Sequence, residues 1–123
     1  MRRVVLESPF AGKGNWLQAT VGRWLNRRYA RACVRDSLLR GEAPIASHLL
    51  YTQPGILNDQ IPDERTQGIA AGLSWLTVAD ASVVYTDRGI SAGMRYGAAA
   101  AEGAGLPVEY RTIERRRDEP DAF

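Results

Sequence analysis

The sequence contains few of the residues that build metal sites and disulfide bonds. It has 123 residues, with one cysteine, Cys33, and one histidine, His48. A single cysteine excludes an internal disulfide, and one cysteine with one histidine cannot supply the four ligands of a typical zinc site. We therefore expect no bound metal and no cofactor.

Long apolar runs are also missing. No stretch approaches the roughly 18 consecutive apolar residues of a membrane-spanning helix. The first residues, MRRVVLESPF, include two arginines but no long apolar region, which is unlike a signal peptide. These features predict a cytoplasmic protein with no membrane partner.

Lysine is nearly absent, since Lys13 is the only lysine among 16 basic residues. The formal net charge is only +2, so a nucleic-acid partner is not expected. Five arginines nevertheless share one arc of a predicted helix, which is either a solvated face or a contact surface for a subunit or polyanion: Arg23, Arg27, Arg28, Arg31 and Arg35.

Turn residues divide the chain into alternating strands and helices. The expected strands are Arg3–Leu6, Ala43–Ala46, Ala81–Tyr85 and Pro107–Tyr110, and the expected helices run from Trp16 to about Leu39, from Asp63 to about Val78, and over Ser91–Gly103. The first helix is expected to bury one apolar arc: Leu17, Val21, Leu25, Tyr29, Ala32, Cys33 and Leu39.

Alternation of strands and helices predicts an α/β fold. We expect a three-layer, Rossmann-like (flavodoxin-like) sandwich with a parallel sheet of four to five strands. Residues 1–113 would form one domain, and residues 114–123 would form a polar C-terminal tail.

The segment after the strand Ala81–Tyr85 predicts an anion site. A helix that begins at the carboxyl end of a parallel strand offers unpaired N–H groups and a positive dipole end. The loop after the first strand should lie beside it. The expected ligand-binding residues of these two segments are Ser8, Pro9, Phe10, Gly12, Asp87, Gly89, Ser91, Gly93 and Met94.

A long segment, Ser47–Pro62, follows the second strand and is expected to be a loop on the same edge of the sheet. It contains His48, which is a candidate ligand contact and acid or base; the alternative is a structural hydrogen-bonding role. Tyr51 and Gln53 in the same loop are candidates to line a base pocket.

Four motifs occur in a specific order: VVLESPFAG, W-L-x-x-A-D, S-x-G-x-x-Y and G-L-P-V. With them the chain resembles the nucleoside 2-deoxyribosyltransferase-like superfamily, including its nucleotide N-glycosidase branch, and most of all small phage and bacterial proteins of unknown function in that group. The resemblance covers most of the chain and implies a homodimer or higher homo-oligomer.

The resemblance also implies two catalytic carboxylates, and both are missing. The position of the family's nucleophilic Glu is Gly97, and the position of the Asp that serves the leaving base is Gly72. The Ser at position 91 matches the nucleotide-using branch and favours a 5′-phosphorylated ligand.

The sequence therefore predicts a protein that binds a nucleotide or nucleotide-sugar, with the 5′-phosphate at the Ser91 turn, and lacks the standard glycosidic chemistry. The alternative is a nucleotide N-glycosidase or 2-deoxyribosyltransferase that uses relocated acids, with Asp87, Asp59 and Glu64 as candidates beside His48. A third hypothesis is an interaction protein whose arginine-rich helix binds an acidic partner or nucleic acid.

Overall fold

Four parallel strands form the centre of the molecule in this computed structural model, which describes residues 1–115. The strands are β1 (Arg2–Glu7), β2 (Glu42–Ile45), β3 (Ala81–Tyr85) and β4 (Val108–Arg111). They lie in the order β2-β1-β3-β4, and every neighbouring pair is parallel. This order is that of a flavodoxin-like sheet.

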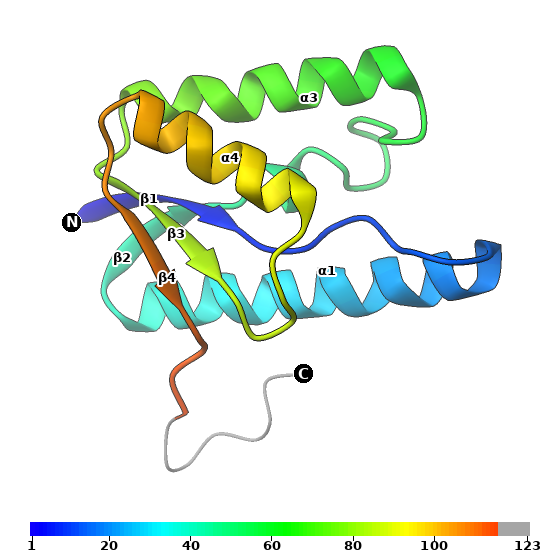
Figure 1. Cartoon of the computed structure of the whole chain (residues 1–123), viewed down its shortest axis with the longest axis horizontal. Coiled ribbons are helices and arrows are strands. Elements are labelled where there is room, and N and C mark those ends of the chain that lie inside the picture. The colour runs from blue at the N-terminus through cyan, green and yellow to red at the C-terminus, as the bar shows by residue number, and fades with distance from the viewer. Residues whose placement is uncertain (116–123) are drawn as a thin grey trace.

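Helices cover both faces of the sheet (Figure 1). Helix α1 (Trp16–Leu39) lies on one face, and α3 (Pro62–Ser74) and α4 (Ala92–Gly103) lie on the other. A short helix α2 (Ser47–Leu50) precedes α3, and a 3-10 turn, η1 (Trp75–Thr77), follows it. The predicted three-layer α/β sandwich is thus confirmed, with four strands among the described residues.

The strand sequences explain the two-sided burial. In β1 the side chains alternate: Val4 and Leu6 pack with the α1 layer, and Val5 packs on the other side with Leu76 and Ala101. Every residue of β3 is buried, as expected for a central strand of a parallel sheet covered on both faces. By this alternation, Glu7 points into the layer of α3 and α4.

The predicted buried arc of α1 is wrong for two residues near the start of the helix and for its last residue. Leu17, Val21 and Leu39 are exposed, with 56%, 48% and 45% of their surface accessible. The first turns of α1 extend past the strands, so no sheet covers them (Figure 1). The buried residues lie further along: Asn26, Tyr29, Ala30, Ala32, Cys33, Asp36 and Ser37.

Two local features define the ends of α1. Asn15 caps the helix, because its side chain accepts a hydrogen bond from the backbone of Gln18 while the Gln18 side chain binds the backbone of Asn15. Gly41 follows the helix with a φ of +84°, a conformation that glycine adopts at little cost.

Other boundaries differ modestly from expectation. The segment predicted as a loop from Ser47 begins instead as the helix α2, and Pro62 stands at the first helical position of α3, where its missing N–H costs nothing. Residues 116–123 of the predicted tail lie outside the described residues. The division into a domain 1–113 and a tail remains a prediction.

A charged network crosses the sheet beneath the second half of α1. Glu42 of β2 accepts two hydrogen bonds from Arg111 of β4, at 2.8 and 2.9 Å, and a third from Arg2 at 3.1 Å. The Arg111 guanidinium lowers the pKa of Glu42 to about 2. Side chains from three strands are thereby tied together on one face.

In the described part of the chain, no helix is both long and apolar enough to cross a bilayer. No cluster of three or more His, Cys, Asp or Glu side chains among residues 1–115 is arranged to hold a metal ion.

Candidate functional site

The candidate site lies at the carboxyl edge of the sheet. The chain leaves β1 toward β2 on one side, whereas β3 pairs with β1 on the other side, so the strand order reverses at β1. Ligands of open α/β sheets bind at such a switch point, outside the carboxyl ends of the strands. Three segments meet there: the end of β1 at Glu7, α2 after β2, and the start of α4 after β3.

Glu7 occupies the space that a side chain at position 97 would fill. A Cβ atom built on Gly97 would stand 2.2 Å from Oε1 of Glu7 and 2.6 Å from its carboxyl carbon. The carboxylate of β1 therefore lies against the bare backbone of α4. It takes the place where the family resemblance expects a carboxylate from α4 itself.

The Glu7 carboxylate has no hydrogen-bond or ion-pair partner among residues 1–115. Partial burial without a compensating cation disfavours its charged form and raises its pKa to about 7. A carboxylate that is free of structural partners and half ionised near neutral pH is typical of a functional group.

The start of α4 keeps two amides available for an anion. The Ser91 hydroxyl accepts a hydrogen bond from the Met94 amide at 3.3 Å, and the Ser91 amide donates to the Met94 sulfur. Ala92 and Gly93 are exposed, and their amides have no partner among the described residues. The predicted anion site thus has the required donors, although its occupancy remains a prediction.

Ser8 and His48 join the ends of β1 and β2. The Ser8 hydroxyl lies 2.7 Å from Nε2 of His48, and the Phe10 ring meets the imidazole edge-to-face at 6.1 Å. Burial lowers the pKa of His48 to about 4, so the ring is neutral at pH 7. This pair holds the loop after β1 against α2, and it brings two predicted ligand residues together.

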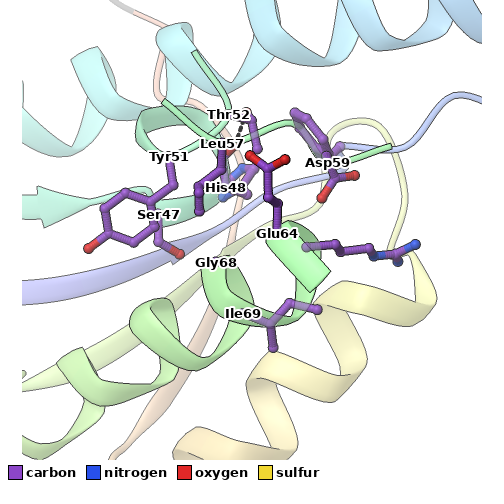
Figure 2. A pocket seen from close by; sticks show the side chains of 11 residues that line it. Ser47, His48, Tyr51, Thr52, Leu57, Asp59, Glu64, Gly68 and Ile69 are labelled. Carbon is purple, nitrogen blue, oxygen red and sulfur yellow. Dashed lines mark hydrogen bonds between the residues drawn. The ribbon is translucent and has the colours of Figure 1, made fainter. Parts of the chain in front are cut away.

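A cavity of about 90 Å³ opens beside this pair (Figure 2). Its apolar walls include Phe10, Leu57 and Ile69, and two carboxylates, Asp59 and Glu64, line it as well. The Glu64 side chain extends from α3 toward the 51–60 loop, where it accepts a hydrogen bond from the Asn58 amide at 3.1 Å. Phe10, His48, Asp59 and Glu64, each singled out from the sequence, therefore share one cavity.

Glycines on α3 bring α2 close to this cavity. Gly68 and Gly72 follow Glu64 at intervals of four residues, so all three lie on one stripe of the helix. A Cβ on Gly72 would stand 2.5 Å from the Ser47 hydroxyl. At this position, where the family resemblance expects an Asp, Ser47 of α2 therefore fills the space beside the glycine.

The other predicted ligand residues do not line this cavity. Asp87 accepts a hydrogen bond from the Tyr29 hydroxyl at 2.5 Å and one from the Ile113 amide at 3.2 Å, which tie the turn after β3 to α1 and to the segment after β4. Gly12 packs directly on α1, where a Cβ would meet the Ala19 carbonyl oxygen at 2.0 Å. Gly89 is an exposed turn residue with a φ of +86°, and Pro9 is buried.

Sequence reasoning missed Glu7. The available signal was a carboxylate at the end of an otherwise apolar strand, two residues before Pro9. Its meaning depends on Gly97, 90 positions further along the chain, and only the three-dimensional contact reveals that connection.

Comparison with known proteins supports the fold class. The chain matches the structure of a 2-deoxyribosyltransferase from Bacillus psychrosaccharolyticus, an enzyme described as a biocatalyst for nucleoside synthesis. The match has a TM-score of 0.56 and 20% sequence identity, and it covers 94% of this chain and 77% of the other. A search of curated proteins finds no match. The fold is therefore that of the deoxyribosyltransferase-like α/β proteins.

Within that class, residues 2–111 match the model of one particular family, described as a domain of unknown function, DUF7768. The match spans most of the chain, and the protein belongs to this family.

Proposed function

We propose that this protein cleaves the N-glycosidic bond of a nucleotide, or transfers its sugar phosphate to another base, with Glu7 as the nucleophile. The observation that carries the proposal is the position of the Glu7 carboxylate in the space of the missing side chain at Gly97. The proposal keeps the nucleotide as the ligand. It replaces the expected loss of glycosidic chemistry with the alternative, in which an acid at another position does the chemistry. That acid is Glu7 and none of the candidates expected from the sequence.

The reaction needs one bond to form at the sugar as another breaks. An ionised Glu7 oxygen attacks the anomeric carbon, and the base leaves with the electrons of the carbon–nitrogen bond and takes a proton from water. The resulting ester between Glu7 and the sugar phosphate is then attacked by water, which gives the free sugar phosphate, or by a second base, which gives a new nucleotide. The attacking group loses its proton to the hydroxide that the first step left. Either attack returns Glu7 to its carboxylate form.

The neighbouring elements support the remaining roles. The free amides of Ala92 and Gly93, with the Ser91 hydroxyl, suit a 5′-phosphate, because a helix start favours negative charge. The cavity beside His48 suits the base, since its Phe10 ring offers a stacking surface and the Glu64 carboxylate accepts hydrogen bonds from ring N–H groups.

The pH dependence follows from the nucleophilic role. Only ionised Glu7 attacks, and its pKa is about 7. We expect kcat/KM to rise with pH between about 6 and 8 and then to level off. A rate that falls over this range would assign Glu7 the role of a proton donor instead.

The direct test is the release of free base from a panel of 5′-mononucleotides. We expect turnover by the wild-type protein and a loss of about a thousandfold or more in Glu7→Gln. The matched control is Glu102→Gln, which removes an exposed carboxylate from α4 and should leave the rate unchanged. Nucleotide binding without base release in the wild type would support a binding module without chemistry and overturn the catalytic proposal.

The phosphate assignment has its own test. Ser91→Asp places a negative charge at the start of α4, so it should weaken the binding of 5′-phosphorylated ligands far more than the binding of the matching nucleosides. Isothermal titration of both ligand classes measures this difference. Equal weakening of the two classes would contradict a phosphate at Ser91.

A further inference from the structure

A second, larger cavity adjoins the base cavity. It is a groove of about 530 Å³ between the first half of α1 and the 51–60 loop. Five residues line both spaces, so the groove and the base cavity lie next to each other: Phe10, Thr52, Leu57, Asp59 and Glu64. The proposed reaction at Glu7 assigns no role to the groove.

Two arginines of α1 face this groove. Arg23 and Arg27 are four residues apart, so they lie on the same side of the helix, and both are partly buried. Arg23 donates a hydrogen bond to the Thr20 hydroxyl at 3.3 Å, and the Arg27 guanidinium lies 5.8 Å from the centre of the Phe10 ring. Neither arginine has an acidic partner within 4 Å among residues 1–115.

Two partly buried guanidinium groups without a counter-ion favour an anionic ligand. Each guanidinium presents a planar fork of N–H donors, which matches the oxygen atoms of a phosphate group. The carboxylates of Asp59 and Glu64 belong to the part of the groove that it shares with the base cavity. The side of the groove lined by Arg23 and Arg27 therefore suits an anionic part of a ligand. The side lined by Asp59 and Glu64 suits a part that donates hydrogen bonds.

We propose that Arg23 and Arg27 form a phosphate subsite that is separate from the start of α4. The subsite binds a phosphate-bearing group either on the nucleotide itself or on a second phosphorylated molecule next to it. Its position beside the base cavity rests on the proposed function, whereas phosphate binding by the two arginines does not depend on any catalysis.

The test uses inorganic tripolyphosphate as the probe, with binding measured by isothermal titration at fixed salt. We expect the double variant Arg23→Gln/Arg27→Gln to bind it about tenfold or more weakly than the wild type. The control is Arg28→Gln/Arg31→Gln, which removes the same charge from exposed positions of the same helix and should change binding less than about twofold. Circular dichroism establishes that both variants are folded.

Two results would overturn the subsite: no binding of tripolyphosphate by the wild type, or equal weakening in the two double variants. Equal weakening for a single-stranded oligonucleotide as well would indicate a general nucleic-acid surface on α1 instead. Base release in Glu7→Gln reports on the catalytic proposal separately, so the two proposals fail independently.

A competition experiment identifies which molecule carries the phosphate. Competition between tripolyphosphate and a 5′-nucleotide would show that the subsite binds a phosphate group of the nucleotide itself. Simultaneous binding of both would indicate a second phosphorylated molecule, and either result supports the subsite.

Discussion

At the scale of single residues, the Glu7 carboxylate lies directly against the backbone of Gly97. The glycine leaves a side-chain-sized space on α4, and the carboxylate of β1 fills that space. Partial burial without a cation makes the charged form of Glu7 costly, as its raised pKa of about 7 shows. Such a cost to stability is common where a group is kept for function.

This cost gives a prediction with a defined sign. The Glu7 pKa is raised from 4.5 to about 7 on folding, so the folded state holds the proton more tightly and loses stability as pH rises between these values. We expect Glu7→Gln to be more stable than the wild type by about 1–3 kcal/mol at pH 8 and equally stable below pH 4. Urea unfolding at both pH values measures the difference. A destabilised Glu7→Gln at pH 8 would contradict an unpartnered carboxylate.

Two variants test whether the Glu7 carboxylate depends on the space at Gly97. One fills that space, and the other moves the carboxylate to α4. In Gly97→Ala the new Cβ would displace the Glu7 side chain, because the atoms it meets are the far end of a flexible group. Base release should therefore fall sharply while the protein stays folded. The double variant Glu7→Ala/Gly97→Glu restores a carboxylate from the other side and should recover part of the lost rate. A double variant no better than Glu7→Ala would contradict equivalence of the two positions.

At the scale of elements, α2 and α3 shape the base cavity through glycine contacts. A Cβ on Gly72 would meet Ser47 at 2.5 Å from Oγ and 3.1 Å from Cβ, so Gly72→Ala must turn the Ser47 hydroxyl away and shift Ser47 of α2 slightly from α3. We expect a loss of about 1–3 kcal/mol in unfolding free energy. The control Gly103→Ala, where a Cβ meets no atom within 4 Å, should gain up to about 1 kcal/mol from helix propensity. Urea denaturation compares the two, and similar effects would contradict a tight α2–α3 contact.

The elements also show what local patterns can predict. Strands β1 and β3 follow from apolar runs bounded by turn residues, and the structure confirms them. The buried face of α1 was mispredicted because periodicity does not tell where the sheet ends under a helix. The cavity that unites Phe10, His48 and Glu64 was only partly predictable, since it depends on how α2 and the 51–60 loop pack against α3.

At the scale of the whole molecule, one charged network ties both edge strands together. Glu42 of β2 and Arg111 of β4 meet across the sheet, and both side chains are largely buried. Buried ion pairs of this kind cost much to break, because removal of one partner leaves an uncompensated charge. The network also fixes the second half of α1, since Ser37 donates a hydrogen bond to Glu42 at 2.8 Å.

This network predicts how the protein responds to acid. The Glu42 pKa is lowered from 4.5 to about 2 on folding, so its contribution is present above pH 4.5 and is lost as pH falls toward 2. We expect the unfolding free energy of the wild type to fall by about 3 kcal/mol over this range on account of this group. Glu42→Gln should show a correspondingly flatter profile in urea unfolding. An equally steep profile in this variant would assign the acid sensitivity to other carboxylates.

The central claim is that Glu7 forms a bond to the sugar of a nucleotide. The most direct measurement is mass spectrometry of protein quenched in acid during turnover of a 5′-mononucleotide, followed by peptide mapping. The account predicts a mass increase of one sugar phosphate residue on the peptide that contains Glu7, and none in Glu7→Gln. An adduct on another carboxylate, or base release by Glu7→Gln at the wild-type rate, would contradict it.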